Sequence, residues 1–283
     1  MPTIGFTSTT FTDEPTALPG LEFAIEHGFH ALELSGNYVW PDVMASGEAR
    51  ELRIESARHG VSLSIHFPTR FFPGSSDDSA RLDCVRQLRA TIGVAREIGA
   101  GVVVVHPGPV YTPAEEAGVP AEDDRADARQ RAAESVRQVA GDAEDAGVML
   151  CLENLPFDKG MAVRSYADQL DLLQRVPSPV VALTLDVGHA FRSGGIAEAF
   201  GAFGPWRRHM HIHDATEDRP HLELGSGIID FAAHAGLLRA FPHTMIMEIN
   251  VEGEGQTKPA RGRTKPALIR SREILRRLLG NVI

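Results

Sequence analysis

The chain has 283 residues, 43% of them hydrophobic, and its 38 acidic residues outnumber its 28 Lys and Arg residues to give a net charge of −10. This length suits one globular domain that buries a large core, and it fits a barrel of alternating strands and helices, which takes about 250 residues. Because nucleic-acid binders use a basic footprint to displace counterions from phosphates, the acidic charge disfavours nucleic acid and favours a small-molecule substrate.

Short apolar runs alternate along the chain with segments of helical periodicity. Eight runs are rich in Val, Ile and Leu, as buried parallel strands are. In chain order they are Thr3–Phe6, Ala31–Leu34, Val61–His66, Val102–His106, Val148–Glu153, Val180–Asp186, His209–His213 and Thr244–Glu248. Apolar residues three and four apart indicate helices between them, for example at Ala80–Ile98, Ala126–Ala146, Ser165–Val176 and Pro266–Leu279.

The alternation of strand and helix predicts a parallel sheet covered by helices. Glycines stand just before four of the strands, where a helix commonly ends on glycine; they are Gly28, Gly60, Gly99 and Gly147. Eight strand–helix units favour closure of the sheet, so the predicted fold is α/β, a (β/α)8 TIM barrel forming a single catalytic domain over residues 1–283. The segment Glu252–Lys265, rich in Gly, Glu, Lys and Arg, is predicted to be a long loop at the catalytic end, with a mobile surface loop as the alternative.

Side chains that bind metals stand at the ends of the apolar runs. They are His66, His106, Glu153, Asp186, His211 and Glu248, with His189 in the turn after Asp186. A parallel barrel brings the carboxyl ends of its strands together at one face, where such enzymes have their active sites. Several carboxylates in one cavity repel one another unless a cation lies between them. A mixture of Asp, Glu and His suits a divalent metal such as Mn, Co, Mg or Zn, and we predict a site of this kind.

The neighbours of these residues leave alternatives open. A single His or Glu at a strand end is more often a satisfied polar residue than a ligand, but six strand ends together favour a site. His209 and His213 share a face with His211, and His213 would replace it as a ligand if the strand ended later. Glu33 either touches substrate or has a structural role.

Eight segments of the chain resemble, in the expected order, the xylose-isomerase-like barrel superfamily, which also contains the endonuclease IV-type enzymes. They are Gly28–Leu34, Ser64–Pro68, Val103–Gly108, Cys151–Leu155, Leu185–His189, His211–Asp214, Leu224–Asp230 and Ile246–Ile249. Each segment is weakly specific, but together they span nearly the whole chain. The ordered set is specific for the superfamily and much less so for one reaction.

One branch of this superfamily consists of sugar isomerases and epimerases that hold a single metal with Glu, Asp, His and Glu. The resemblance assigns these ligands to Glu153, Asp186, His211 and Glu248. It also implies that Glu153 and Glu248 are the catalytic residues. They would move protons, from opposite faces, at the carbon next to a metal-bound carbonyl of a sugar or sugar-phosphate-like substrate. His189 would orient the substrate oxygens.

The endonuclease IV-like branch implies an alternative function, phosphoester hydrolysis at a cluster of zinc ions. Additional candidate ligands for such a cluster are His66, His106, His189, His221 and Asp218. Two residues separate Asp218 from His221, where that family has one, and this departure argues against Asp218 as a ligand. The acidic charge favours a small molecule over DNA as the substrate of such a hydrolase.

We favour the isomerase or epimerase function and keep the zinc-dependent phosphodiesterase as the alternative. Arg192, which follows His189 closely, is a candidate for binding a phosphate or carboxylate of the substrate, or a solvated arginine. A third class is a barrel that binds a metal or a sugar without catalysis. The absence of Glu153 or Glu248 would have indicated this class, and both residues are present.

The expected localisation follows from sequence features that the chain lacks, and the expected assembly follows from its class of barrel. Residues 1–30 have no basic segment followed by an apolar run, and no apolar stretch approaches the roughly 20 residues that span a bilayer. Cys84 and Cys151 form no CxxC pair, which fits a reducing compartment. We therefore expect a soluble, cytoplasmic protein without a membrane partner. Barrels of this class often pair, so a homo-oligomer stays open.

Overall fold

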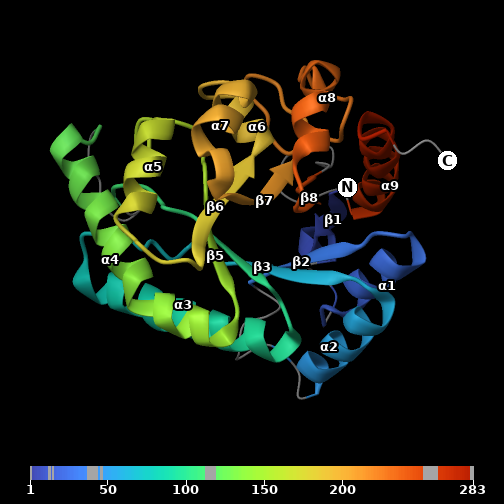
Figure 1. Ribbon diagram of the computed structural model, residues 1–283, viewed down its shortest axis with the longest axis horizontal. Helices are drawn as coiled ribbons and strands as arrows, with labels where there is room; N and C mark the ends of the chain where they lie inside the picture. The colour runs from blue at the N-terminus through green and yellow to red at the C-terminus, as the bar shows by residue number, and fades with distance from the viewer. Residues whose placement is uncertain are drawn as a thin grey trace.

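The computed structural model describes residues 2–11, 14, 16–36, 44, 47–111, 119–250 and 261–280. Eight parallel strands pair in chain order, and the eighth pairs with the first, so that they form a closed barrel (Figure 1). The strands are β1 (Thr3–Thr7), β2 (Ala31–Ser35), β3 (Ser62–His66), β4 (Val102–Val105), β5 (Met149–Glu153), β6 (Val181–Asp186), β7 (Arg207–Ile212) and β8 (Thr244–Met247). The predicted (β/α)8 barrel is confirmed.

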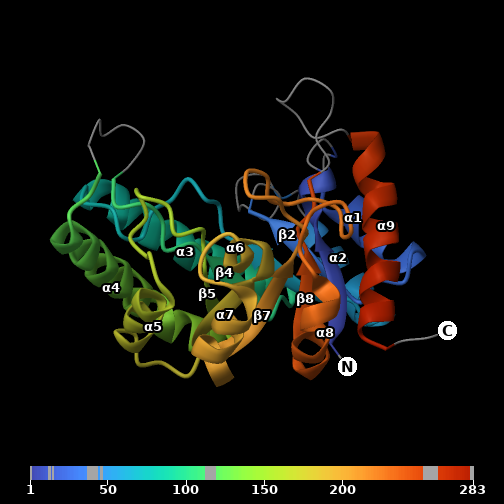
Figure 2. The same cartoon turned by 90° about the horizontal axis from the view of Figure 1, so that it is seen from above.

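Helices lie on the outer side of the strands, as Figures 1 and 2 show. In the described residues they are α1 (Leu18–Glu26), α2 (Glu48–His59), α3 (Asp78–Ile98), α4 (Glu122–Ala146), α5 (Tyr166–Gln174), α6 (Val187–Phe191), α7 (Ile196–Phe203), α8 (Phe231–Ala240) and α9 (Arg261–Leu278), with short 3-10 helices η1 (Ser8–Phe11) and η2 (Gly204–Trp206). Among the residues described, no helix has the length and apolar character needed to cross a membrane.

The helix α3 illustrates why the chain forms these elements. Its Leu88, Ile92 and Ala95, spaced four and three apart, are buried against the barrel, as an amphipathic helix requires. The Asp77 carboxylate caps its first turn by accepting the backbone N–H groups of Ser79 and Ala80. Of the four glycines predicted at helix ends, Gly60, Gly99 and Gly147 are C-caps with left-handed backbone. The C-cap of α1 is His27 instead, and Gly28 follows it with a φ of 66°.

Several predicted boundaries change in the structure. Strands β4 and β8 end one residue before His106 and Glu248, so these two side chains start the loops that follow. The predicted loop Glu252–Lys265 is wrong at its end, because α9 begins at Arg261 and contains Pro266 in its interior. A proline suits the first turn of a helix, which explains why the sequence places the start too late. The rest of the segment, 252–260, lies outside the described residues.

The barrel interior is unusually polar for a packed core. Its fully or almost fully buried polar side chains include Glu33, Thr184, Asp186, His209 and His211. Apolar side chains fill the layer between strands and helices instead, and this division leaves the interior free to hold charged groups close together. Polar groups in such a place must be paired or bind an ion, which directs attention to the carboxyl ends of the strands.

The tight pairing of β1 with β2 gives a test of the barrel packing. A Cβ atom added to Gly5 would lie 2.4 Å from the carbonyl oxygen of Ala31, with which Gly5 pairs in register. We expect Gly5→Ala to lower the free energy of unfolding by about 1–3 kcal/mol, since backbone atoms must move apart.

The control is Gly93→Ala, because Gly93 is exposed in α3 and an added Cβ atom meets nothing within 4 Å. This change should raise the free energy of unfolding by about 0.5–1 kcal/mol. Urea unfolding of both variants checks the pair, and unchanged stability of Gly5→Ala would contradict the packing described.

Candidate metal centre

Four side chains from consecutive strands converge at the carboxyl end of the barrel. Glu153 ends β5, Asp186 ends β6, His211 lies in β7 and Glu248 follows β8. One oxygen or nitrogen atom of each residue lies within 4.8 Å of the corresponding atom of the other three. The structure thus brings together the four residues that the sequence predicted as ligands.

The ring of His211 lies at the centre of this group. Its Nδ1 atom is 3.2 Å from Glu248 Oε2, 3.3 Å from Glu153 Oε1 and 3.9 Å from Asp186 Oδ2. The side chains of Glu153, Asp186 and His211 are fully buried, whereas that of Glu248 is 15% exposed. Three carboxylates therefore surround one imidazole nitrogen, with access from the cavity on the side of Glu248.

Within the described part of the chain, three of these donor atoms are buried and have no hydrogen-bond partner: Glu153 Oε1, Asp186 Oδ2 and His211 Nδ1. Buried polar atoms without a hydrogen bond are rare in proteins because desolvation makes them costly. Their convergence, and the mixture of carboxylate and imidazole donors, fits a divalent cation such as Mn, Co, Mg or Zn.

Backbone contacts hold Asp186 in the orientation that a ligand needs. The Asn154 side chain accepts the N–H group of Asp186 at 2.8 Å and donates to its carbonyl oxygen at 3.0 Å. The Oδ1 atom of Asp186 accepts the N–H group of His189 at 2.7 Å. Because Oδ1 accepts this hydrogen bond at the start of α6, Oδ2 is the oxygen that faces His211 and the other two carboxylates.

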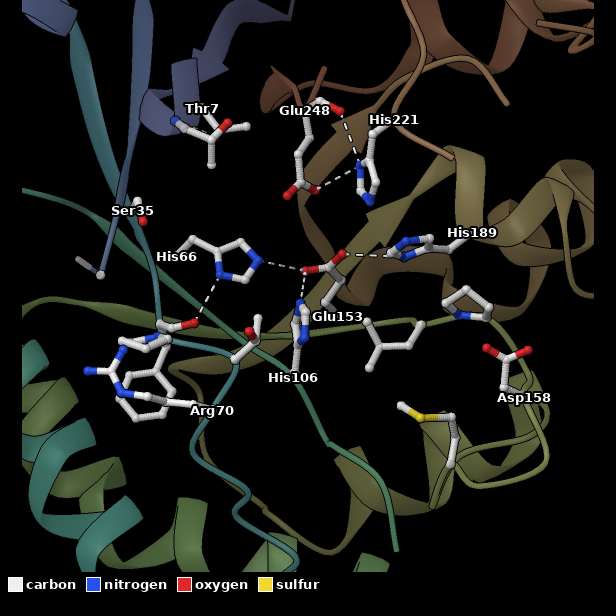
Figure 3. A pocket seen from close by; sticks show the side chains of 18 residues that line it. Thr7, Ser35, His66, Arg70, His106, Glu153, Asp158, His189, His221 and Glu248 are labelled. Atoms are coloured by element: carbon white, nitrogen blue, oxygen red, sulfur yellow. Dashed lines mark hydrogen bonds and ion pairs between the residues drawn. The ribbon is translucent and has the colours of Figure 1, made fainter. Parts of the chain in front are cut away.

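The second oxygen of Glu153 faces two further histidines. His106 Nε2 lies 3.1 Å and His66 Nε2 3.5 Å from Glu153 Oε2, and Figure 3 shows both rings directed at this carboxylate. His66 Nδ1 lies 2.9 Å from the carbonyl oxygen of Phe67, which leaves Nε2 for Glu153 or an ion. These three residues form a second group of potential metal ligands.

A third group consists of His189, His213 and His221. The rings of His213 and His221 are 4.3 Å apart between centroids, and His213 Nε2 lies 3.2 Å from Asp186 Oδ1. His221 has a positive φ of 58°, which is uncommon for a residue other than glycine. The site is thus a continuous cluster, with Glu153 and Asp186 each in contact with histidines of two groups.

The charges of the cluster stabilise one another. Burial by itself would raise the pKa of Glu153, but the nearby His211 and His106 hold it well below its usual value. Burial would likewise raise the pKa of Glu248, and His221 and His211 lower it instead. Burial would lower the pKa of His66, yet Glu153 and the other carboxylates raise it to about 9. Both glutamates are therefore ionised in this arrangement.

Asp214 is an organising residue that the sequence did not single out. Its Oδ1 atom accepts the N–H groups of Ala215 and Ile229, at 2.8 and 3.1 Å. Its Oδ2 atom accepts those of Gly225 and Gly227, each at 2.9 Å. Since one carboxylate closes the loop that carries His221, it fixes the position of that histidine. The segments His211–Asp214 and Leu224–Asp230, which carry the superfamily resemblance, flank this loop. Its closure depends on three-dimensional contacts that the sequence does not show.

Two candidates of the sequence lie apart from the cluster. Asp218 is exposed on the loop after β7 and belongs to none of the ligand groups. Arg192 Nε donates to the carbonyl oxygen of Glu217 at 3.2 Å, because α6 ends there beside the same loop. The alternative in which His213 replaces His211 is not needed for the four-residue group, since β7 ends at Ile212.

A cavity of about 630 Å³ opens above the cluster, a size that suits a small molecule. Glu153, Glu248, His66, His106, His189 and His221 reach it, as do the hydroxyl-bearing residues Thr7, Thr9 and Ser35. Arg70 lines the same cavity (Figure 3) and stacks its guanidinium over Phe71 at 4.8 Å. No pattern in the sequence pointed to Arg70, because loop shape decides which arginine borders the cavity.

Residues 21–277 match the family described as xylose isomerase-like TIM barrel. The chain belongs to this family. It is 28% identical to an uncharacterized protein of Methanocaldococcus jannaschii over 236 residues, which are 80% of this chain and 76% of that protein.

Solved structures share the fold over nearly their whole length. A D-tagatose 3-epimerase-like protein superposes with a TM-score of 0.78 at 24% identity, covering 98% of this chain and 97% of that one. A D-psicose 3-epimerase in the presence of D-fructose gives a TM-score of 0.81 at 18% identity, covering 98% and 99%. The IolI protein with a bound zinc atom gives 0.75 at 15% identity, covering 99% of each chain.

Replacing Asp214 tests how the loop around His221 is held. In Asp214→Asn an amide NH2 group faces backbone N–H donors, so about two hydrogen bonds are lost. We expect a loss of about 2–4 kcal/mol in the free energy of unfolding. Amide hydrogen exchange at residues 221–229 should quicken. Asp230→Asn is the matched control, because Asp230 caps α8 through the Ala233 N–H group and asparagine caps equally well. Equal exchange in the two variants would count against the role of Asp214.

Proposed function

We propose that the protein is a divalent-metal-dependent isomerase or epimerase that acts on a sugar or sugar-phosphate-like substrate. The observation that carries the proposal is the group of Glu153, Asp186, His211 and Glu248 at the floor of a cavity, where three buried donor atoms converge without a hydrogen bond. The fold shared with ketose 3-epimerases supports it, and the zinc atom of the IolI structure supports a metal in this kind of barrel.

The four residues would hold one divalent cation in their shared space. The chemistry that such an ion supplies is polarisation of a substrate carbonyl, which stabilises the negative charge left when a proton leaves the adjacent carbon. Glu153 and Glu248 are the only carboxylates of the four that line the cavity. Their low pKa values mean that each starts as a base.

Proton transfer is assigned to these two glutamates. One carboxylate takes the proton from the carbon and can return that same proton to the neighbouring atom. Return at the opposite face would need the other carboxylate, ionised at the start, to take up a proton from solvent first. His66 and His106 hold Glu153 Oε2 and so orient this carboxylate. His189 and His221, which border the cavity, would orient substrate oxygens, and the hydroxyl groups of Thr7, Thr9 and Ser35 supply hydrogen bonds suited to a polyol.

Metal content is the first test of this proposal. For the purified protein we expect about one Mn, Co or Mg ion per chain by elemental analysis. Removal of the ion with a chelator should lower the melting temperature, because the clustered carboxylates then repel one another. A protein that binds no divalent ion, and whose melting temperature is the same with and without chelator, would overturn the metal centre.

Proton exchange tests the two catalytic glutamates directly. In D₂O, the metal-loaded protein should replace a carbon-bound hydrogen of its substrate by deuterium, seen by NMR across a panel of ketoses and ketose phosphates. Glu153→Gln and Glu248→Gln should each slow this exchange by about 10²–10⁴-fold. Glu217→Gln, which changes an exposed residue outside the cavity, should not. Full exchange in both cavity variants would show that other groups move the proton.

A second function, a multi-zinc phosphodiesterase acting on a small molecule, is favoured by one specific observation. The two histidine groups beside the four-residue group offer places for additional ions, and several metal ions together activate water and stabilise a leaving oxygen. Two or three zinc ions per chain, with hydrolysis of small phosphodiesters and no proton exchange in ketoses, would support this function instead.

A further inference from the structure

Glu33 is a buried carboxylate that the proposed reaction does not use. It lies on β2, is fully buried and is not among the residues that line the cavity. Its Oε2 atom accepts hydrogen bonds from His209 Nε2 at 2.8 Å and from Ser64 Oγ at 3.0 Å. Its Oε1 atom lies 2.9 Å from His211 Nε2. The carboxylate therefore sits behind His211, on the side of the ring away from the cavity.

The two nitrogens of His211 face carboxylates on opposite sides. Nε2 faces Glu33, while Nδ1 faces Glu153 and Glu248 at 3.3 and 3.2 Å. His211 would bind a cation as a neutral imidazole with one proton, and the Glu33 carboxylate 2.9 Å from Nε2 favours that proton on Nε2. The lone pair then lies on Nδ1 and points at the group of ligands.

Burying a carboxylate inside a barrel destabilises the fold unless hydrogen bonds or nearby positive charges compensate for its lost hydration. His209 and Ser64 both bind the Oε2 atom of Glu33, so the buried Oε1 atom faces His211 Nε2, 2.9 Å away. The contact also matters to His211. Its position in β7 does not decide how the ring is oriented or which ring nitrogen carries the proton, so the neighbouring side chains decide both.

We propose that Glu33 is a positioning residue of the metal centre, which orients His211 and commits its Nδ1 atom as the ligand. This inference rests on the proposed metal-dependent function. It makes Glu33 part of the second layer of the site, because it acts through His211 and touches neither metal nor substrate. Glu33 thereby takes a role distinct from the substrate contact that the sequence left open.

The wild-type protein provides the first test. In zinc-loaded protein with ¹⁵N-labelled histidine, NMR should show His211 bound to zinc through Nδ1 and protonated at Nε2. This measurement needs no variant and no substrate. Binding through Nε2, or loss of the Nε2 proton on binding zinc, would overturn the inference.

The second test compares two buried glutamates. Glu33→Gln keeps the shape but removes the negative charge, and its single carbonyl oxygen can accept from His209 or from His211 but cannot take the place of both carboxylate oxygens. The dissociation constant for zinc, measured by competition with a chromophoric chelator, should rise about 10–100-fold. The matched control is Glu48→Gln, because Glu48 is 5% exposed in α2 and its Oε1 atom accepts the Ala17 N–H group at 2.6 Å, away from the metal centre. This control should bind zinc within about twofold of wild type.

The outcomes separate this inference from the proposed function. Wild-type zinc affinity in a folded Glu33→Gln variant would overturn the role of Glu33 and leave the metal centre intact. Equal weakening in Glu33→Gln and Glu48→Gln would also overturn it, since the effect would then follow from any neutralised buried glutamate. A wild-type protein that binds no zinc, manganese or cobalt would overturn both the function and the inference. Weak binding in Glu33→Gln alone would support the inference whatever substrate is found.

Discussion

The mutual repulsion of Glu153, Asp186 and Glu248 is the constraint around which the carboxyl end of the barrel is built. Three carboxylates meet within a few ångströms where water has little access, and in such a place like charges interact much more strongly than in solution. The imidazole of His211 lies between them and offsets part of this charge. The remaining negative charge would attract a cation, so in the proposed function the affinity for metal would come from the way in which the fold holds these groups together.

Rigid backbone contacts allow this concentration of charge. Asn154 ties the backbone of Asp186 to the neighbouring strand, and the carboxylate of Asp214 gathers four N–H groups of the loop that carries His221. Neither residue enters the four-residue group. These hydrogen bonds hold Asp186 and the loop of His221 in place, which in the proposed metal centre would lower the entropy that binding an ion costs.

The regular features of the chain could be predicted from its sequence, and the irregular ones could not. The alternation of apolar runs and helical segments predicted the barrel, because strand and helix periods depend on local sequence alone. Position at strand ends predicted that Glu153, Asp186, His211 and Glu248 would meet, since parallel strands share one carboxyl end. The early start of α9, the exposed place of Asp218 and the cavity position of Arg70 depend on loop contacts between distant segments. The contact of Glu33 with His211 likewise arises only when β2 and β7 face each other across the interior.

The two oxygens of Glu153 face different sets of partners. Oε1 faces His211, and Oε2 faces His66 and His106. A carboxylate in this position can bridge two ions without any movement of the strand that carries it. Under the proposed function, a second ion beside Glu153 would be bound by His66 and His106 while the strand β5 keeps its place. For protein engineers, these two histidines would be one place at which the number of ions is altered within the same scaffold.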